Sequence, residues 1–476
     1  AALMTGERAA IYEEDWQALR VSGLAHIISI SGLHVAMVAG PVFFLVRFFL
    51  ALIPFLALHY PIKKIAAACA LLVACLYVGL VVPSVPTTRS LLMTAIMLIA
   101  VMLDRSPISM RLVAVSAIIV LIFQPESIWS ASFQMSFAAV AALVAVAEAL
   151  APFWSSAYGQ ASWFKRAGLW VMGALLTSLV AALATAPFSL YHFGQLATYS
   201  VFANFVSIPL SGLIIMPMLM VSFILMPFGL DMWSLQLMGK GVEWLLDVAR
   251  ATENLPYAQL SIAAAPVSFL VWSSVAGILL LFLHGRVRLI SIVPALVSFY
   301  CLMSATQPVM LVSEDGGVMA LHDKKNMIVS STKKSKFVTE SWRKYLGVTV
   351  DNVLEFPREG MWQNINCGGG LCRMVVTGQK ITYGDKLYEL HQDCSWADIL
   401  ITPQRAGYNF CKNKNILIVD YYALKQKGAM AFYVGDDGGR LTLKTVAEER
   451  GKRPWSEQHR TYHAFQKTKA IGTDVP

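Results

Sequence analysis

The chain has 476 residues, of which 57% are hydrophobic and only 14% are charged, and its formal net charge at pH 7 is +9. A globular protein has about a quarter of its residues charged, so this composition excludes one large soluble fold. Residues 1–305 carry 14 Lys/Arg and 11 Asp/Glu, whereas residues 306–476 carry 24 and 18. We therefore predict a mainly α-helical, polytopic membrane domain at 1–305 and a soluble α/β or β-rich sandwich domain at 306–476.

The N-terminal stretch is polar and partly acidic. It begins with Ala-Ala, not with Met, and continues as TGERAAIYEEDWQALRVSG, with no visible signal peptide. We interpret this start as the middle of a longer gene product.

Apolar runs recur through the membrane domain, and they lack the polar face of soluble helices. A helix needs about 20 apolar residues to cross a bilayer. Residues 231–256 differ, because charged residues interrupt their helical pattern; they predict an amphipathic helix on the membrane surface or along a cavity. The predicted spans are 33–58, 65–82, 90–103, 112–123, 135–152, 168–190, 205–230, 265–284 and 289–305.

Basic residues indicate the orientation of the spans, because they favour cytoplasmic loops. Three pairs fall in alternate loops, which we place in the cytoplasm. Arg286 and Arg288 obey the same rule only if residues 205–256 cross the membrane an even number of times. Pro209 and Pro217 make a broken or re-entrant segment reasonable there. The C-terminal domain is then extracytoplasmic. The three pairs are Lys63/Lys64, Arg105/Arg111 and Lys165/Arg166.

Cysteines support the same orientation. Four of the seven lie in the C-terminal domain, and an even number suits an oxidising compartment. We predict disulfides among them without a pairing. A structural zinc site, disfavoured by the lack of a C-x-x-C pair, and free thiols are the alternatives. The disulfide candidates are Cys367, Cys372, Cys394 and Cys411.

The first polar stretch in the membrane domain is SGLAHIISISGLHV, residues 22–35. His26 and His34 are eight residues apart, close to one face of a continuous helix, although Gly32 permits a break. Ser29 and Ser31 are suited to capping a helix that starts near residue 33. Ionisable groups at the edge of a span are functional candidates; the alternative is a capped helix whose histidines bond to backbone.

Three further polar stretches follow. VPSVPTTRS (82–90) predicts a proline-broken loop folded into a cavity, or else an exposed loop with a snorkelling arginine. ASFQMSFAAV (131–140) brings polar residues into a span, where hydrogen bonds between helices are the alternative to a functional role. The last is HFGQLATYSVFANFVSIPL (192–210). The candidate residues in these stretches are Arg89, Gln134, Ser136, His192, Gln195, Asn204 and Pro209.

These stretches resemble the ComEC family of competence proteins, which are inner-membrane channels for DNA uptake. HIISISGLHV is the most specific match, and three further matches occur in the order of the family. They are VPTTRSLLMTAIML, RSPISMRLVAVSAIIVLIFQPESIWSASFQMSFAAVA and FANFVSIPLSGLIIMPMLM. The resemblance covers roughly residues 3–300. It implies that the membrane domain passes one DNA strand into the cytoplasm while the other is degraded.

The resemblance also implies a set of sites and partners. His26, Ser29, Ser31, Gly32 and His34 match the first family motif, and Arg89, Gln134, Ser136, Asn204 and Pro209 match later ones. The expected location is the bacterial inner membrane, with the C-terminal domain in the periplasm. The expected partners are single-stranded DNA, membrane lipid, an extracytoplasmic DNA-receptor protein and a cytoplasmic motor or helicase, since the chain has no G-x-x-x-x-G-K-[ST] motif. The family usually has an N-terminal domain with an oligonucleotide-binding-like fold that is absent here.

The C-terminal domain departs from the family. Many members carry a metallo-β-lactamase-like domain with a dense His/Asp motif, but the histidines of this chain are scattered and form no H-x-H-x-D-H cluster. We therefore expect a degenerate, non-catalytic relative or an unrelated fold, with no metal, no cofactor and no catalytic residue. Its excess of basic residues favours binding of DNA or of a partner, and a solvated basic surface without a binding role is the alternative. The scattered histidines are His322, His391, His459 and His463.

Three other functions remain open. An intramembrane serine hydrolase is conceivable because SISG at 29–32 resembles the G-x-S-G of rhomboid-like proteases, with His34 or His192 as base. A small-solute transporter would show inverted repeats, and none is obvious. A structural membrane scaffold is the third.

Overall fold

The computed structural model describes residues 2–7, 9, 11–81, 85–159, 162–323, 325–362, 364–407, 410–411, 416–435 and 439–451. The chain divides into two compact units. The membrane unit comprises residues 1–260 and 265–303, and the C-terminal unit comprises residues 261–264 and 304–476. The division falls close to the change in charge density near residue 305.

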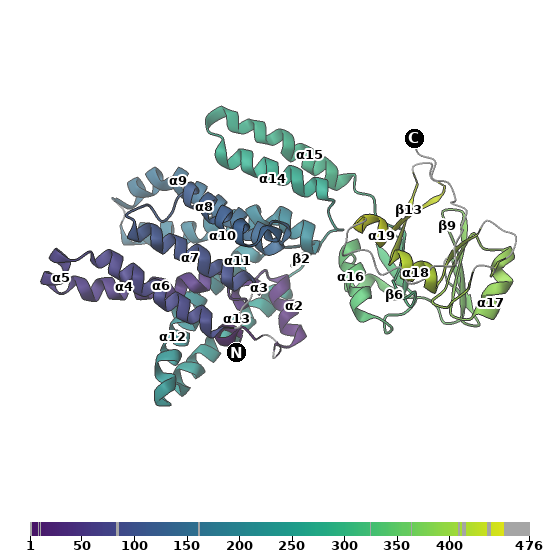
Figure 1. The fold of residues 1–476 in the computed structure, drawn as a ribbon, viewed down its shortest axis with the longest axis horizontal. Helices are drawn as coiled ribbons and strands as arrows, with labels where there is room; N and C mark the ends of the chain where they lie inside the picture. Colours follow the sequence, from purple (N-terminus) through teal and green to yellow (C-terminus); the bar gives the residue numbers. More distant parts are fainter. Residues whose placement is uncertain are drawn as a thin grey trace. The chain divides into compact units, whose positions relative to one another are not determined.

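The membrane unit is a bundle of apolar helices (Figure 1). Six helical stretches in the described part of the chain are long and apolar enough to span a bilayer. They are Gly32–Ala51, Ile62–Leu80, Ala131–Gly159, Trp163–Phe193, Ser200–Phe228 and Gly285–Met303, and the shorter apolar helices are Pro86–Met102, Met110–Phe123 and Val267–Phe282. The predicted fold class, a polytopic membrane protein, is confirmed.

The helices keep the predicted order along the chain. Short helices α1, α2 and α3 precede the first long helix, and 3₁₀ turns lie at Pro125–Trp129, Met226–Phe228 and Gly285–Ser291. The bounds are α1 Ala2–Thr5, α2 Glu13–Val21, α3 Ala25–Ile28, α4 Gly32–Ala51, α5 Pro54–His59, α6 Ile62–Leu80, α7 Val85–Met102, α8 Met110–Phe123, α9 Ala131–Gly159, α10 Trp163–Phe193, α11 Ser200–Leu210, α12 Met216–Leu225, α13 Met232–Glu253, α14 Val267–Phe282 and α15 Ile292–Met303.

Among the predicted span boundaries that differ from the structure, two are explained by proline. The span expected at 33–58 ends at Ala51, because Pro54 starts the separate helix α5. The span expected from residue 90 begins at Val85. Pro86 stands in the first turn of α7, where a missing N–H costs nothing. Arg89 is therefore on a helix and not in a loop; residues 82–84 lie outside the described part.

Residues 200–253 form a helical hairpin. Helix α11, a π-helical turn at Ser211–Ile215 and α12 run in one direction, and α13 returns alongside them. The two ends meet, since Tyr199 Oη donates to Pro256 O at 3.1 Å. The strands β1, Gln195–Ala197, and β2, Gln259–Ser261, form a two-stranded sheet at the same place. The segment thus leaves the bundle at the end where it entered.

Helix α13 is amphipathic, as its sequence predicts. Its buried positions recur every three or four residues and pack on the π-helical turn, where a Cβ at Gly241 would lie 2.9 Å from Ile215 Cγ1. The charged positions Lys240, Glu243 and Asp247 are exposed on the opposite face. At the outer turn, Arg250 pairs with Asp15 of α2 at 2.7 Å.

The C-terminal unit is a sandwich of two six-stranded sheets, so the β-rich expectation is confirmed. The sheet orders are β14-β13-β3-β4-β5-β6 and β12-β11-β10-β9-β8-β7. The bounds are β3 Met310–Val312, β4 Met319–Asp323, β5 Asn326–Val329, β6 Val353–Glu355, β7 Gly360–Trp362, β8 Ile365–Gly368, β9 Leu371–Val376, β10 Gln379–Gly384, β11 Ile399–Ile401, β12 Leu417–Val419, β13 Met430–Val434 and β14 Leu441–Thr445.

Helices cover both outer faces of this sandwich. Side chains alternate along each strand, so Met310 and Val312 of β3 face the core between the sheets while Leu311 contacts the cluster beneath α16, Lys336–Leu346. Leu390 of α17, Leu387–Gln392, packs on the second sheet. The result is an α/β/β/α layering. The remaining helices are α18 Tyr421–Lys427 and α19 Val446–Arg450.

The four candidate cysteines form two disulfides. Cys367 and Cys372 stand directly opposite each other on β8 and β9, with 4.1 Å between their Cα atoms. Cys394 is bonded to Cys411, 17 residues further along the chain. The cysteines described in the membrane unit, Cys69, Cys75 and Cys301, form no disulfide. All disulfides therefore fall in one unit, which suits exposure of that unit to an oxidising compartment.

The disulfides give a first prediction. In the unreduced protein, mass spectrometry should find alkylation only at thiols of the membrane unit. Replacing Cys394 by Ala should lower the free energy of unfolding of the C-terminal unit by about 2–4 kcal/mol, because the bridge to Cys411 closes a long loop. Cys75→Ala, at an exposed free thiol, is the control and should change stability by less than about 0.5 kcal/mol. Alkylation of the four cysteines of the C-terminal unit before reduction would contradict the assignment of the two disulfides.

Candidate functional site

The first polar stretch is broken between two helices. Helix α3 ends at Ile28 and α4 begins at Gly32, so the two histidines do not share the face of one continuous helix. His26 is exposed, and its Nδ1 lies 2.9 Å from Gly23 O. Of the two alternatives, the break permitted by Gly32 is the one found.

Ser31 and His34 cap helix α4. The Ser31 backbone N–H donates to His34 Nδ1 at 3.2 Å, and Ser31 Oγ lies 3.0 Å from the same nitrogen. Since Nδ1 is the acceptor, a neutral ring carries its proton on Nε2. His34 is completely buried, and Nε2 has no hydrogen-bond partner within the described residues. The cap therefore leaves a donor unused in the protein interior.

The second polar stretch, residues 82–90, is hydrogen-bonded to the third, residues 131–140. Arg89 on α7 is only 5% exposed, which rules out a snorkelling arginine. Its Nη2 donates to Ser132 Oγ at 2.6 Å and to Ser136 Oγ at 3.1 Å. The two serines are four residues apart, on one face of α9. The contact thus joins the N-terminal turns of α7 and α9. Ser132 was missed in the sequence, although its spacing from Ser136 marks that face.

The third stretch is in turn bonded to the fourth. Gln134 Nε2 donates to Ile128 O at 2.8 Å, which leaves Oε1 to accept from His192 Nε2 on α10, also at 2.8 Å. Ser189 Oγ donates to the backbone carbonyl of Gln195 at 2.8 Å. His192 is therefore a partner of Gln134, and Gln195 contributes through its backbone at the end of the bundle.

Helix α11 presents a polar face that lacks partners. Asn204, Ser207 and Ser211 are spaced three and four residues apart and so lie on one side of the helix. Asn204 Oδ1 and both serine hydroxyls are buried without hydrogen-bond partners within the described residues. Pro209 removes a backbone donor from this helix, and the π-helical turn follows two residues later. Ser207 and Ser211 are further residues that sequence reasoning missed.

Close backbone contacts complete the connection of the four stretches. A Cβ at Gly32 would lie 3.8 Å from Ser90 Oγ, which places the start of α4 beside α7. A Cβ at Gly23 would lie 2.8 Å from Ser200 Cβ, which places the first stretch against α11. With the bonds of Arg89 and Gln134, each stretch contacts the next, and the fourth contacts the first. The polar stretches thus form one closed ring of neighbours.

A cavity of about 700 Å³ opens beside this ring. It lies among α9, α10 and α11 and is also lined by Met37 of α4. Asn204 and Pro209 are the predicted candidates that reach it; the tryptophans Trp154 and Trp170 and the small residues opposite them were not predicted. The ring therefore borders open volume on the side of α11.

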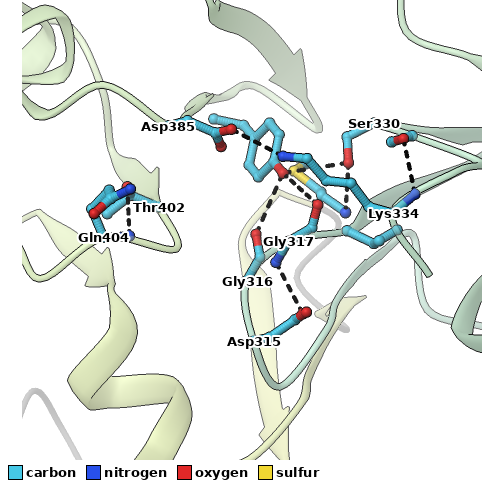
Figure 2. A network of polar contacts seen from close by, with 12 residues as sticks. Asp315, Gly316, Gly317, Ser330, Lys334, Asp385, Thr402 and Gln404 are labelled. Carbon is cyan, nitrogen blue, oxygen red and sulfur yellow. Dashed lines mark hydrogen bonds and ion pairs between the residues drawn. The ribbon is translucent and has the colours of Figure 1, made fainter.

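The C-terminal unit has a polar cluster where several strands end (Figure 2). Lys334, after β5, reaches Asp385, after β10, at 2.9 Å, and this carboxylate raises the pKa of Lys334. Tyr383 Oη donates to Gly317 O at 3.1 Å. Ser313 donates a hydrogen bond to Asp315 that lowers the pKa of this carboxyl group. The cluster is therefore ion-paired within itself.

Basic and aromatic side chains lie on the neighbouring loops. Arg405, after β11, lies over the ring of Tyr421 at 4.9 Å, and Lys425 lies 5.6 Å from the same ring. Within the described residues, no group of three or more His, Cys, Asp or Glu could hold a metal ion. His459 and His463 lie outside those residues. The chemistry of this edge is that of cation–π and ion-pair contacts.

Comparison with known proteins identifies the membrane unit. The model of the competence protein family matches residues 3–287, more than half of the chain. The chain belongs to the competence protein family. It is 33% identical to competence protein ComA of Neisseria gonorrhoeae over 297 residues, which are 60% of this chain and 38% of that protein. It is 27% identical to ComE operon protein 3 of Bacillus subtilis (strain 168) over 216 residues, 45% of this chain and 25% of that protein.

The family match confirms the predicted resemblance to competence proteins. It covers all four polar stretches of the ring, from Ser22 to Leu210. The segments that align with this chain cover 38% of the first relative and 25% of the second, which is well under half the length of either protein. No solved structure matches the chain.

The contact between Gly23 and Ser200 gives a second prediction. Gly23 has a φ of +77°, and a side chain at this position would collide with α11. Gly23→Ala should therefore lower the free energy of unfolding of the membrane unit by about 1–3 kcal/mol. Thermal unfolding in detergent would measure this. Gly79→Ala in α6 is the control, because no atom lies within 4 Å of its Cβ position, and it should be neutral or slightly stabilising. Equal melting temperatures for the two variants would contradict the close packing.

Proposed function

We propose that the membrane unit conducts one unpaired DNA strand across the bacterial inner membrane into the cytoplasm. The observation that carries this proposal is the ring of four polar stretches inside a unit of low charge. Its buried polar atoms that find no partner among the residues described include His34 Nε2, Arg89 Nη1 and Asn204 Oδ1. Polar backbone and side chains are tolerated at membrane depth where they border a water-filled or ligand-filled path.

Inward transport of DNA through such a path needs an energy source. Moving one phosphate inward against an inside-negative potential costs about 2.3 kcal/mol per 100 mV, so passage needs a driving force. We propose that a motor or helicase in the cytoplasm supplies it, and that an extracytoplasmic receptor delivers the DNA. A path lined by hydroxyls, amides and helix ends contacts phosphates weakly, and weak contacts let a strand move.

We further propose an orientation in which helices α4, α7, α9 and α11 all start on the extracytoplasmic side. The basic loops that follow α4, α7 and α9 support a cytoplasmic position for the far ends of these three helices. Because residues 200–253 return to the end where they entered, the loop of Arg286 and Arg288 becomes cytoplasmic and the C-terminal unit periplasmic. The two disulfides of that unit support the same side.

One contact bears on the alternative of an intramembrane serine hydrolase. Ser31 Oγ and His34 Nδ1 are 3.0 Å apart, as a nucleophile and base would be. However, the same nitrogen accepts the Ser31 backbone N–H, which makes the pair a helix cap. We therefore expect no labelling of Ser31 by a fluorophosphonate probe. Labelling that depends on His34 would favour the hydrolase instead.

A matched pair of variants at His34 tests the strand path and is the third prediction. Gln at the third position of a helix preserves the capping box, and so does Glu, but Glu brings a negative charge to the buried site. His34→Glu should reduce transformation by at least about tenfold, whereas His34→Gln should remain within a few-fold of wild type. Transformation frequency at equal protein level is the measurement, with Arg111→Gln as an exposed control. Wild-type transformation by His34→Glu would remove the residue from the path.

The orientation gives the fourth prediction. Alkaline phosphatase, which is active only after export, should be active when inserted at Tyr257 or fused after Pro476, and inactive when inserted at Leu230 between α12 and α13. Enzyme activity normalised to fusion-protein level is the measurement. The opposite pattern, with activity only at Leu230, would show that the unit is inverted and the C-terminal unit cytoplasmic.

A further inference from the structure

Arg89 is a buried cation that contacts no carboxylate within the described part of the chain. It is 5% exposed, and its hydrogen bonds to described residues go to two neutral serine hydroxyls of α9. No ion pair joins it to a carboxylate among the described residues, and its Nη1 is buried without a partner. Burying an unpaired charge costs several kcal/mol. A second charge of opposite sign would remove much of that cost.

The surroundings of Arg89 are themselves electropositive. Ser132, which accepts from Arg89, is the second residue of α9. Gly32, the first residue of α4, lies beside Ser90 of α7. The N-terminal turns of α7 and α9 therefore meet at the guanidinium, and the first residue of α4 lies beside the neighbouring Ser90. Each helix start acts like about half a positive charge and exposes backbone N–H groups.

The unused hydrogen-bonding atoms here are donors. Arg89 Nη1 can only donate. His34, in the first turn of α4, has an Nε2 with no hydrogen-bond partner in the part of the chain that the structure describes, and its cap assigns the proton to that nitrogen. A buried cation with an unused donor, at the joined N-terminal turns of α7 and α9 and beside the start of α4, suits an anion with several acceptor oxygens.

We propose that Arg89, together with the N-terminal turns of α4 and α9, is a binding station for a single phosphodiester group of the translocating strand. This rests on the proposed function and names the group that its path recognises. The station has one guanidinium, so it holds one phosphate at a time. It contacts no base, so its affinity should not depend on the base sequence of the strand. Ser132 and Ser136 are positioning residues that hold the guanidinium in place.

A phosphodiester also occurs in phospholipid headgroups, so the test separates the two sources. The full-length protein in maltoside detergent would be titrated with a 12-residue oligothymidylate, with the same oligomer carrying neutral methylphosphonate links, and with phosphatidylglycerol. Thermal shift and microscale thermophoresis would give the affinities. Only the charged oligomer should bind to the wild-type protein with an affinity that depends on Arg89.

The variants Arg89→Gln and Arg89→Lys locate the binding. A hydrogen bond to a charged group contributes about 1.5–3 kcal/mol, so Arg89→Gln should weaken oligomer binding by roughly ten- to a hundredfold. Arg89→Lys keeps the charge and loses the planar fork; it should show an intermediate affinity, and it serves also if the Gln variant does not fold. Arg111→Gln should bind like wild type.

Three results would overturn the station. They are equal oligomer affinity in wild type and both Arg89 variants, equal binding of the methylphosphonate oligomer, and an Arg89-dependent affinity for phosphatidylglycerol in place of the oligomer. Failure of the proposed function looks different. In that case the oligomer would bind at Arg89, yet a strain that lacks the protein would take up DNA at the wild-type rate.

Discussion

Water is absent from the hydrocarbon core of a bilayer, so a polar side chain at that depth must find its hydrogen-bond partner within the protein. This constraint determines how the membrane unit is assembled. Arg89 bonds to two serines of α9, and Gln134 of the same helix bonds to His192 of α10. Such contacts fix which helices are neighbours, because an apolar surface alone packs equally well against lipid or against another helix.

The same constraint gives meaning to the places where it is not met. The buried atoms without partners in the described membrane unit belong to His34, Arg89, Asn204, Ser207 and Ser211. All five residues lie within the polar stretches that the competence family match covers. Native proteins leave few buried polar groups unpaired, and local rules are broken chiefly at functional sites. Structural need alone therefore accounts poorly for this clustering.

The sequence predicts what is local and misses what is tertiary. Hydropathy identified the apolar spans, because the signal of a span lies within about 20 consecutive residues. It misplaced the start of α7, since a proline in a first turn and a proline in a loop look alike. The spacing of Ser132, Gln134 and Ser136 indicated a polar helix, but nothing local to it points to Arg89, more than forty residues away. In the C-terminal unit, strands were visible, while their order in two sheets was not.

The two units treat a buried charge differently, and the difference bears on Arg89. In the C-terminal unit, Asp393 is 1% exposed and accepts from Arg373 Nε at 2.9 Å and from Thr382 Oγ1 at 2.9 Å. Its charge is thus paired, which is the usual condition for burial. The partners of Arg89 are neutral serine hydroxyls, whereas the partner of Asp393 is the guanidinium ion of Arg373. A carboxylate at Ser132 or Ser136 would complete the pair, but it would also repel a phosphate on the proposed strand path. The serines at these positions are therefore consistent with the proposed path.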